Sequence, residues 1–394
     1  MVRAALVEML QRMTKTKRAL VLSGGGARGA YQVGVLKAIA DLHGKSAPNP
    51  FSIISGTSSG AINAVALATS ANNFRLAVKK LEHFWQQLSV DQVYKANAWD
   101  LMISGGSLVL SMLNKGMGRS QPLAFLNNEP LRQLLSQTIQ FSNIQKRIDA
   151  GYLDAVSVNA TGYTSGESVS FFQARADIKG WRKGRRVGIS TQLGIKHLMA
   201  SSAIPTIFPA EKVSREYFGD GALRQLAPLS PALKFGADKI LVIGVSGNPT
   251  IIPKREMTLH SPSLAQMIGH VFNSAFIDSL EHDLDIMLRI NDLIRLDARR
   301  VAYTSQGQVR TINLLTIQPS IEFDEVAARH VQHLPRAMRY MMNTTGATKE
   351  GGGASFASYL LFEPPFCREL IKQGYLDTMA QEHEVRAFFV DETD

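Results

Sequence analysis

Gly56-Thr57-Ser58-Ser59-Gly60 directly follows the apolar run Phe51-Ser52-Ile53-Ile54, and this junction sets the architecture of the chain. The five residues form the pattern G-x-S-x-G. It holds a serine in a strained turn between a strand and a helix, so that the hydroxyl projects from the end of the sheet. Both glycines are needed because a side chain at either position would collide where the turn is tightest. We therefore interpret Ser58 as a candidate nucleophile. The alternative is a glycine-serine turn without chemistry, because five-residue matches also occur by chance.

A second junction of the same kind lies upstream. The run 18–22 predicts a short buried strand, residues 23–29 read Ser-Gly-Gly-Gly-Ala-Arg-Gly, and residues 30–39 predict a helix whose apolar side chains recur every four residues. Two consecutive strand–turn–helix units indicate a mostly parallel sheet covered by helices. The fold class that we predict is therefore α/β.

The glycine loop also satisfies a nucleotide-binding pattern, because Gly24, Gly26 and Gly29 form G-x-G-x-x-G between a strand and a helix. That fingerprint requires an acidic residue about 20 positions further on, to hold the ribose. The second predicted strand ends without a carboxylate, and Gly29 is followed by Ala30 where the Walker pattern requires lysine. Nucleotide binding therefore stays only as an alternative from another class of function.

The same loop also suits an oxyanion hole. Glycines at the start of a helix expose backbone N–H groups, and the helix dipole adds partial positive charge. If the two predicted strands are neighbours, the amides of Gly25 and Gly26 face the carbonyl that Ser58 would attack, with the Ser59 amide as a third donor. Each such donor is worth about 3–4 kcal/mol in the transition state. For Arg28 we consider an anchor of the loop, a contact to an anionic headgroup, and a surface salt bridge at the start of the helix.

The residue composition divides the chain into three predicted parts. Residues 1–17 predict an amphipathic N-terminal segment, 18–250 a catalytic domain, and 251–394 a mainly helical C-terminal extension. Residues 97–118 form an apolar insert with a glycine hinge, which we interpret either as a lid or interfacial surface or as part of the core. Residues 189–203 predict a helix.

The formal net charge is +10 and the pI is about 9.6, with basic runs at 15–18, 182–186 and 299–300. No zinc-ligand spacing or aromatic RNA-binding motif accompanies these runs, so nucleic acid is not an expected partner. An anionic membrane surface is one interpretation, since each basic side chain near the headgroups adds about 1 kcal/mol. A solvated basic face is the other.

The cysteine content, the apolar runs and the spacing of possible metal ligands indicate the cellular compartment and the need for cofactors. A single cysteine, Cys367, excludes an intramolecular disulfide and fits a reducing compartment. The sequence has no secretory leader and no uninterrupted apolar run of about 18 residues, so we expect a cytoplasmic protein whose membrane contact is peripheral. Because no cluster of metal ligands is visible, we expect no metal and no other cofactor.

A serine nucleophile needs a base, and none of the nine histidines lies in the late loop where a hydrolase triad would place one. Asp220, between Gly219 and Gly221, is the one carboxylate in a loop that permits close approach of the backbone.

Taken together, the glycine loop Gly24–Gly29, the turn Gly56–Gly60 and Asp220-Gly221-Ala222 closely resemble, in order and spacing, the patatin-like phospholipase family. Ala200-Ser201-Ser202-Ala203-Ile204-Pro205 is also similar to the segment before that family's aspartate. The resemblance covers residues 18–245. It departs after Gly221, where the family often has asparagine–x–proline and this chain has Leu223–Pro228, so the bracing of the Asp220 loop is in question.

The resemblance implies a three-layer helix–sheet–helix fold around a mostly parallel central sheet. It also implies a dyad without histidine, in which Ser58 is the nucleophile and Asp220 accepts its proton. The expected substrate is a phospholipid or lysophospholipid, cleaved to a free fatty acid, and the alternative is a non-lipid carboxylesterase or thioesterase with the same dyad. The expected oxyanion and substrate-binding residues are Gly24, Gly25, Gly26, Arg28, Gly29 and Ser59, and the motif glycines are Gly56, Gly60 and Gly221.

Overall fold

The structure is a computed structural model that describes residues 16–44, 47–95, 124–246, 261–296, 303–304, 307–308, 310–344 and 353–391. The strands are β1 (Arg18–Leu22), β2 (Ile53–Thr57), β3 (Ala155–Gly162), β4 (Ser168–Ala174), β5 (Trp181–Lys183), β6 (Arg186–Ser190), β7 (Glu211–Val213), β8 (Glu216–Asp220), β9 (Lys239–Ile243), β10 (Tyr303–Thr304), β11 (Gly307–Gln308) and β12 (Asn313–Ile317). The α-helices are α2 (Ala30–His43), α3 (Ser59–Thr69), α4 (Phe74–Gln87), α5 (Val90–Val93), α7 (Glu129–Thr138), α8 (Ser142–Asp149), α9 (Ile195–Ser201), α10 (Ser230–Lys234), α11 (Leu264–Asn273), α12 (Ser279–Leu296), α13 (Phe323–His330), α14 (Arg336–Thr344), α15 (Ala354–Leu360), α16 (Pro364–Ala380) and α17 (Glu382–Phe389).

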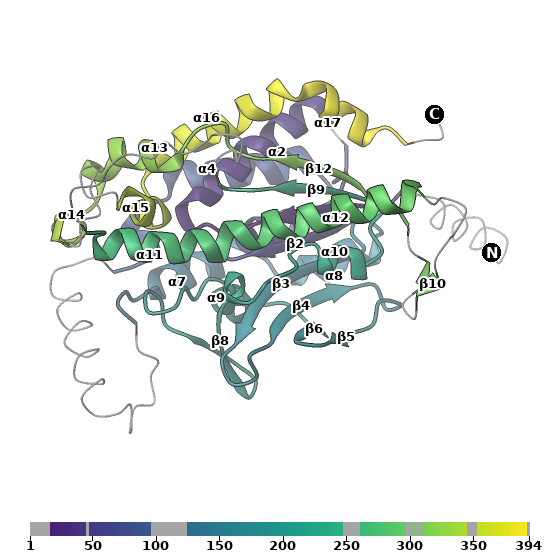
Figure 1. Cartoon of the computed structure of the whole chain (residues 1–394), viewed down its shortest axis with the longest axis horizontal. Coiled ribbons are helices and arrows are strands. Elements are labelled where there is room, and N and C mark those ends of the chain that lie inside the picture. The colour runs from purple at the N-terminus through teal and green to yellow at the C-terminus, as the bar shows by residue number, and fades with distance from the viewer. Residues whose placement is uncertain are drawn as a thin grey trace.

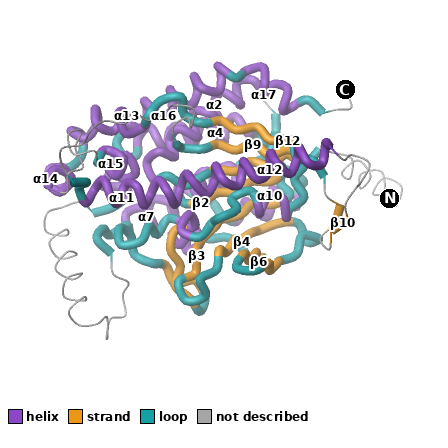
Figure 2. Tube along the Cα trace, viewed as in Figure 1, coloured by secondary structure: helices purple, strands orange, loops and turns teal. Residues whose placement is uncertain are grey.

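One sheet runs through the middle of the molecule in the order β12-β9-β1-β2-β3-β4-β6-β5, with β8 paired to β3 and β7 to β8 (Figure 2). The five strands from β12 to β3 are parallel to one another. β3 pairs antiparallel with both β4 and β8. The sheet is therefore mixed but mostly parallel in its centre, as predicted.

Helices cover both faces of this sheet and give three layers (Figure 1). Successive side chains of a strand point to opposite faces, and β1 shows this directly. Leu20 and Leu22 belong to the core beneath α2, α3, α4 and α16, whereas Ala19 and Val21 belong to the core beneath α10 and α12. A strand that is apolar on both faces is typical of a buried parallel sheet. This confirms the three-layer prediction.

The described residues after 260 pack into the same cores and the same sheet as the residues before 246. β12 extends the central sheet beside β9, and α16 packs against α2. The two helices touch through backbone at glycines: a Cβ on Gly34 would lie 1.9 Å from the Ile371 carbonyl oxygen, and one on Gly374 would lie 2.2 Å from that of Tyr31. Strand pairing and this close helix contact are long-range features that composition does not reveal.

The predicted helix 189–203 is wrong in its first part. β6 continues to Ser190 because it pairs with β4, and α9 begins only at Ile195. The predicted segment 1–17 falls almost wholly outside the described residues, and the insert 97–118 does so entirely. In the described part of the chain, no helix combines the length and the apolar character needed to cross a membrane.

Candidate active site

Ser58 sits at the sharp turn between β2 and α3, as predicted. Its backbone has φ 55° and ψ −126°, a conformation that side chains rarely adopt and that costs about 1–3 kcal/mol. The turn is tight enough that a Cβ on Gly56 would lie 2.3 Å from the Gly60 carbonyl oxygen. A Cβ on Gly60 would lie 2.4 Å from the Leu22 carbonyl oxygen of β1. These contacts explain why the motif needs glycine at both positions.

Two buried side chains hold this turn, and the sequence did not assign a role to either. The Ser58 backbone N–H donates to Ser201 Oγ at 2.8 Å, and Ser201 Oγ donates to the Asn159 carbonyl at 2.6 Å. Asn159 Nδ2 in turn donates to the Gly56 carbonyl at 3.0 Å. An asparagine within a strand that is buried along its whole length was the available signal, because a buried polar side chain is normally hydrogen-bonded.

The glycine loop lies beside the Ser58 turn. β1 and β2 are parallel neighbours with Leu22 opposite Gly56, so both loops leave the sheet at the same edge. A Cβ on Gly24 would lie 3.0 Å from the Cβ of Ser58, and Gly26 has φ 57°. Among the described residues, no loop or turn hydrogen bond takes the amides of Gly25 and Gly26. The loop thus brings backbone N–H groups next to the serine.

Arg28 anchors this loop and does not face solvent. Its guanidinium, 3% exposed, donates to Ser358 Oγ at 2.8 Å, pairs with Asp324 at 2.8 Å, and lies 4.1 Å from the centre of the Tyr359 ring. Of the three predicted roles, the anchor is therefore the one that fits. Contact with a lipid headgroup and a surface salt bridge do not fit, because the partners come from α13 and α15 and enclose the side chain.

Asp220 reaches the site through strand pairing. It ends β8, which runs antiparallel to β3 with Asp220 opposite Ala160, and β3 is the neighbour of β2. The carboxylate is 1% exposed; Oδ1 accepts from the Ala222 N–H at 3.0 Å, and Oδ2 has no hydrogen-bond partner among the described residues. Burial raises the pKa of Asp220 to about 7, against the opposing effects of the Ser58 hydroxyl and the Ala222 amide.

The loop that follows Asp220 is held in place by Gln225, which lies in the segment Leu223–Pro228 where the sequence departs from the family pattern. Thr57 Oγ1, next to Ser58, donates to Gln225 Oε1 at 2.5 Å. Thr161 Oγ1 donates to the Gly221 carbonyl at 3.3 Å. A Cβ on Gly221 would lie 2.3 Å from the Asn159 carbonyl oxygen, so the glycine allows the loop to press against β3. The Asp220 loop is therefore tied to both β2 and β3 without the asparagine–x–proline motif.

Two cavities of different size lie beside Ser58 and Asp220. Ser58, Ser59 and Ser202 line a small cavity of about 20 Å³ with apolar walls. Asp220 lies in a larger groove of about 280 Å³ whose lining is almost entirely apolar, and α11 together with the π-helical turn Ser274–Asp278 forms one side of it. Ile204 lines both cavities. The groove has room for several carbon atoms between apolar walls, whereas the small cavity has room for about one water molecule.

The buried histidine of the described residues has bonding partners of its own. Of the described histidines, only His197 is fully buried; its Nδ1 accepts from the Gly194 N–H at 3.0 Å, and its ring packs 4.9 Å from that of Phe171. Burial lowers the pKa of His197 to about 4. No group of three or more possible metal ligands occurs among the described residues.

These features bring a strained serine turn, a glycine loop and a buried aspartate together at one edge of a mostly parallel, helix-covered sheet. Residues 20–233 match the family model described as patatin-like phospholipase, and the chain belongs to this family. A cGAMP-activated phospholipase of Escherichia coli (strain TW11681) is 27% identical over 219 residues, which are 52% of this chain and 52% of that protein. The chain thus matches about half the length of that relative.

Two solved structures are similar at lower identity. VipD from Legionella pneumophila is 13% identical, with 94% of this chain and 67% of that chain covered and a TM-score of 0.36. Human GIVD cytosolic phospholipase A2 is 12% identical, with 95% and 59% covered and a TM-score of 0.40.

Proposed function

We propose that this chain hydrolyses acyl esters of phospholipids or lysophospholipids through a Ser58–Asp220 dyad. The observation that carries the proposal is the position of Asp220. A carboxylate with a raised pKa of about 7 and a free Oδ2 lies in reach of a serine held in a strained turn. An ordinary aspartate, with a pKa of about 3.9, is a weak base for a hydroxyl. A pKa near the working pH makes Asp220 a far better proton acceptor.

The reaction has two balanced halves. Asp220 takes the hydroxyl proton of Ser58 while Oγ attacks the ester carbonyl carbon, and the carbonyl oxygen becomes an oxyanion. Amides of Gly25, Gly26 and Ser59 stabilise this charge. The intermediate collapses to an acyl-serine, and the leaving alcohol takes the proton from Asp220. Water, giving a proton to Asp220, then attacks the acyl-serine; the fatty acid leaves, and the proton returns to Ser58.

The apolar groove supports a lipid as the substrate. Its lining gives an acyl chain a dry surface next to Asp220, and burial of apolar area stabilises binding by about 25 cal/mol per Å². Leu223, Met267 and Val271 line it while remaining 38%, 49% and 63% exposed. Exposed apolar residues at the mouth of such a groove suit contact with a lipid aggregate. We propose that the enzyme works at the surface of membranes or micelles.

The test is to assay Ser58→Ala and Asp220→Asn separately on a micellar phospholipid. We expect Ser58→Ala to lose about 10⁴-fold or more in kcat, and Asp220→Asn about 10²–10⁴-fold, with both variants folded. Asp149→Asn on α8 is the matched control, because this aspartate is exposed and should leave kcat unchanged. In the parent enzyme kcat should rise with pH and level off above about pH 7, as Asp220 loses its proton.

Full activity in Asp220→Asn would exclude the dyad. A chain that cleaves dispersed short-chain esters or thioesters but no micellar phospholipid would instead be the carboxylesterase or thioesterase alternative.

A further inference from the structure

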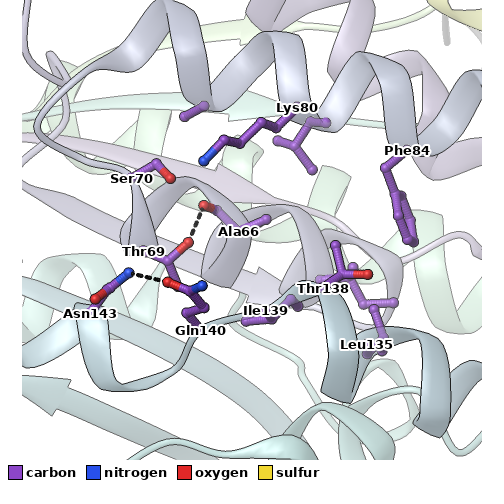
Figure 3. A pocket seen from close by; sticks show the side chains of 13 residues that line it. Ala66, Thr69, Ser70, Lys80, Phe84, Leu135, Thr138, Ile139, Gln140 and Asn143 are labelled. Carbon is purple, nitrogen blue, oxygen red and sulfur yellow. Dashed lines mark hydrogen bonds between the residues drawn. The ribbon is translucent and has the colours of Figure 1, made fainter.

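A second pocket, separate from the groove at Asp220, lies behind the nucleophile helix. It has a volume of about 150 Å³, is open to solvent, and is lined by residues of α3, α4, α7 and the start of α8 (Figure 3). Its floor is apolar and is formed mainly by Ile62, Ala66, Leu81, Leu135 and Ile139. A cavity of this size with such a lining is large enough for a molecule like benzene. The floor therefore has room for about six carbon atoms.

One end of the pocket is polar and positively charged. Lys80 lies along it, with its ammonium group directed toward Ser70 (Figure 3). In the described part of the chain Lys80 has no ion pair and no hydrogen bond, and no described residue lining the pocket carries a carboxylate. Arg147 adds a second positive charge nearby, since its Nε donates to the Thr69 carbonyl at 3.3 Å. An unpaired ammonium beside an apolar floor is complementary to an anion with a hydrocarbon chain.

Two other polar side chains at this end already donate hydrogen bonds within the protein. Thr69 Oγ1 donates to the Ala66 carbonyl at 2.8 Å, and Asn143 Nδ2 donates to Gln140 Oε1 at 2.9 Å, as the dashed lines in Figure 3 mark. These side chains are therefore fixed, whereas the Lys80 ammonium keeps all three of its donors. The ligand's charged group is thus expected at Lys80.

We propose that this pocket binds a medium-chain fatty acid, with its carboxylate on the Lys80 ammonium and its chain over the apolar floor. The choice of a fatty acid rests on the proposed function, because a fatty acid is the product of that reaction. Charge-assisted hydrogen bonds to the carboxylate would fix the head, and burial of the chain would supply most of the affinity.

The position of the pocket relates this ligand to catalysis. Ile62 and Phe84 line both the pocket and the small cavity at Ser58, so one layer of side chains separates the two. Ile62 also lies on α3, one turn after Ser58. A fatty acid in the pocket therefore rests against the wall of the cavity at Ser58.

The test is calorimetric titration of octanoate into the full chain. Octanoate is not an ester, so its binding is measured whether or not the chain hydrolyses lipids. Lys80→Met keeps most of the side-chain stem and removes the charge, and we expect it to weaken octanoate about tenfold or more. Lys79→Met is the matched control, because Lys79 is the adjacent lysine on α4, is exposed as Lys80 is, and does not line the pocket. It should change the affinity less than about twofold.

Two further measurements show where the hydrocarbon chain and the carboxylate of the fatty acid bind. Ala66→Leu places a larger side chain on the floor and should weaken both octanoate and the neutral 1-octanol. Lys80→Met should leave 1-octanol unaffected, because that ligand has no carboxylate. Thermal unfolding checks that each variant is folded. Equal octanoate affinity in Lys80→Met and the parent, an unchanged affinity in Ala66→Leu, or no saturable binding to the parent chain would each overturn the proposal.

Discussion

Asp220→Asn is expected to remove activity and, at the same time, to stabilise the folded protein at alkaline pH. The pKa of Asp220 is about 7 in the folded chain and 3.8 in an unfolded one, so between these values the folded state holds a proton that the unfolded state has lost. By linkage, the stability of the parent protein must fall as pH rises through this window, and then stay level above about pH 7. Asparagine does not titrate, so the stability of the Asp220→Asn variant does not fall in this way.

The size of the effect follows from the same two pKa values. Each tenfold change in the ionisation constant corresponds to about 1.4 kcal/mol, so the whole window from 3.8 to about 7 corresponds to about 4 kcal/mol. Between about pH 5 and pH 8 the expected change is about 3 kcal/mol, because part of the window lies below pH 5. Asparagine keeps the hydrogen bond that Oδ1 accepts from the Ala222 N–H. The difference is thus mainly the free energy of holding a buried negative charge.

Urea unfolding followed by tryptophan fluorescence measures this change. The free energy of unfolding of Asp220→Asn minus that of the parent should increase by about 3 kcal/mol from about pH 5 to about pH 8. Asp149→Asn is the control for exchanging a carboxylate for an amide on the surface. A difference that stays the same at both pH values would refute the reasoning, because it would mean that burial does not raise the pKa of Asp220.

Two further predictions concern the parts that hold the site. Ser58→Gly should be about 1 kcal/mol more stable than Ser58→Ala, because glycine adopts φ 55° without strain; equal urea midpoints would show that the turn stores no strain at this residue. Arg28→Met should lower the free energy of unfolding by about 2–3 kcal/mol and reduce esterase activity, because it removes the buried hydrogen bonds that tie the glycine loop to α13 and α15. Arg75→Met, which breaks the surface pair with Asp41 at the same 2.8 Å, should cost less than about 1 kcal/mol; equal losses in both variants would contradict a special role for Arg28.

The local features of the site were readable in the sequence because they depend on backbone geometry within a few residues. The G-x-S-x-G turn requires glycine for steric reasons, and Ser58 has the strained conformation that this turn imposes. The two strand–turn–helix units likewise predicted a parallel sheet with both loops at one edge, and β1 and β2 are paired in this way. Asp220 was singled out by its two flanking glycines and by family resemblance, and neither gives its position in space.

Other features depended on which distant segments meet. β8 pairs with β3, and this pairing alone brings Asp220 to the edge where Ser58 lies. Arg28 is buried because α13 and α15 surround it, and residues beyond 250 complete the sheet through β12. Strand order and helix contacts follow from burial summed over the whole chain, so short stretches of sequence do not specify them. The sequence by itself therefore determined the turn at Ser58 and the glycine loop beside it, whereas tertiary packing decided the position of Asp220, its raised pKa and the anchors that hold the site.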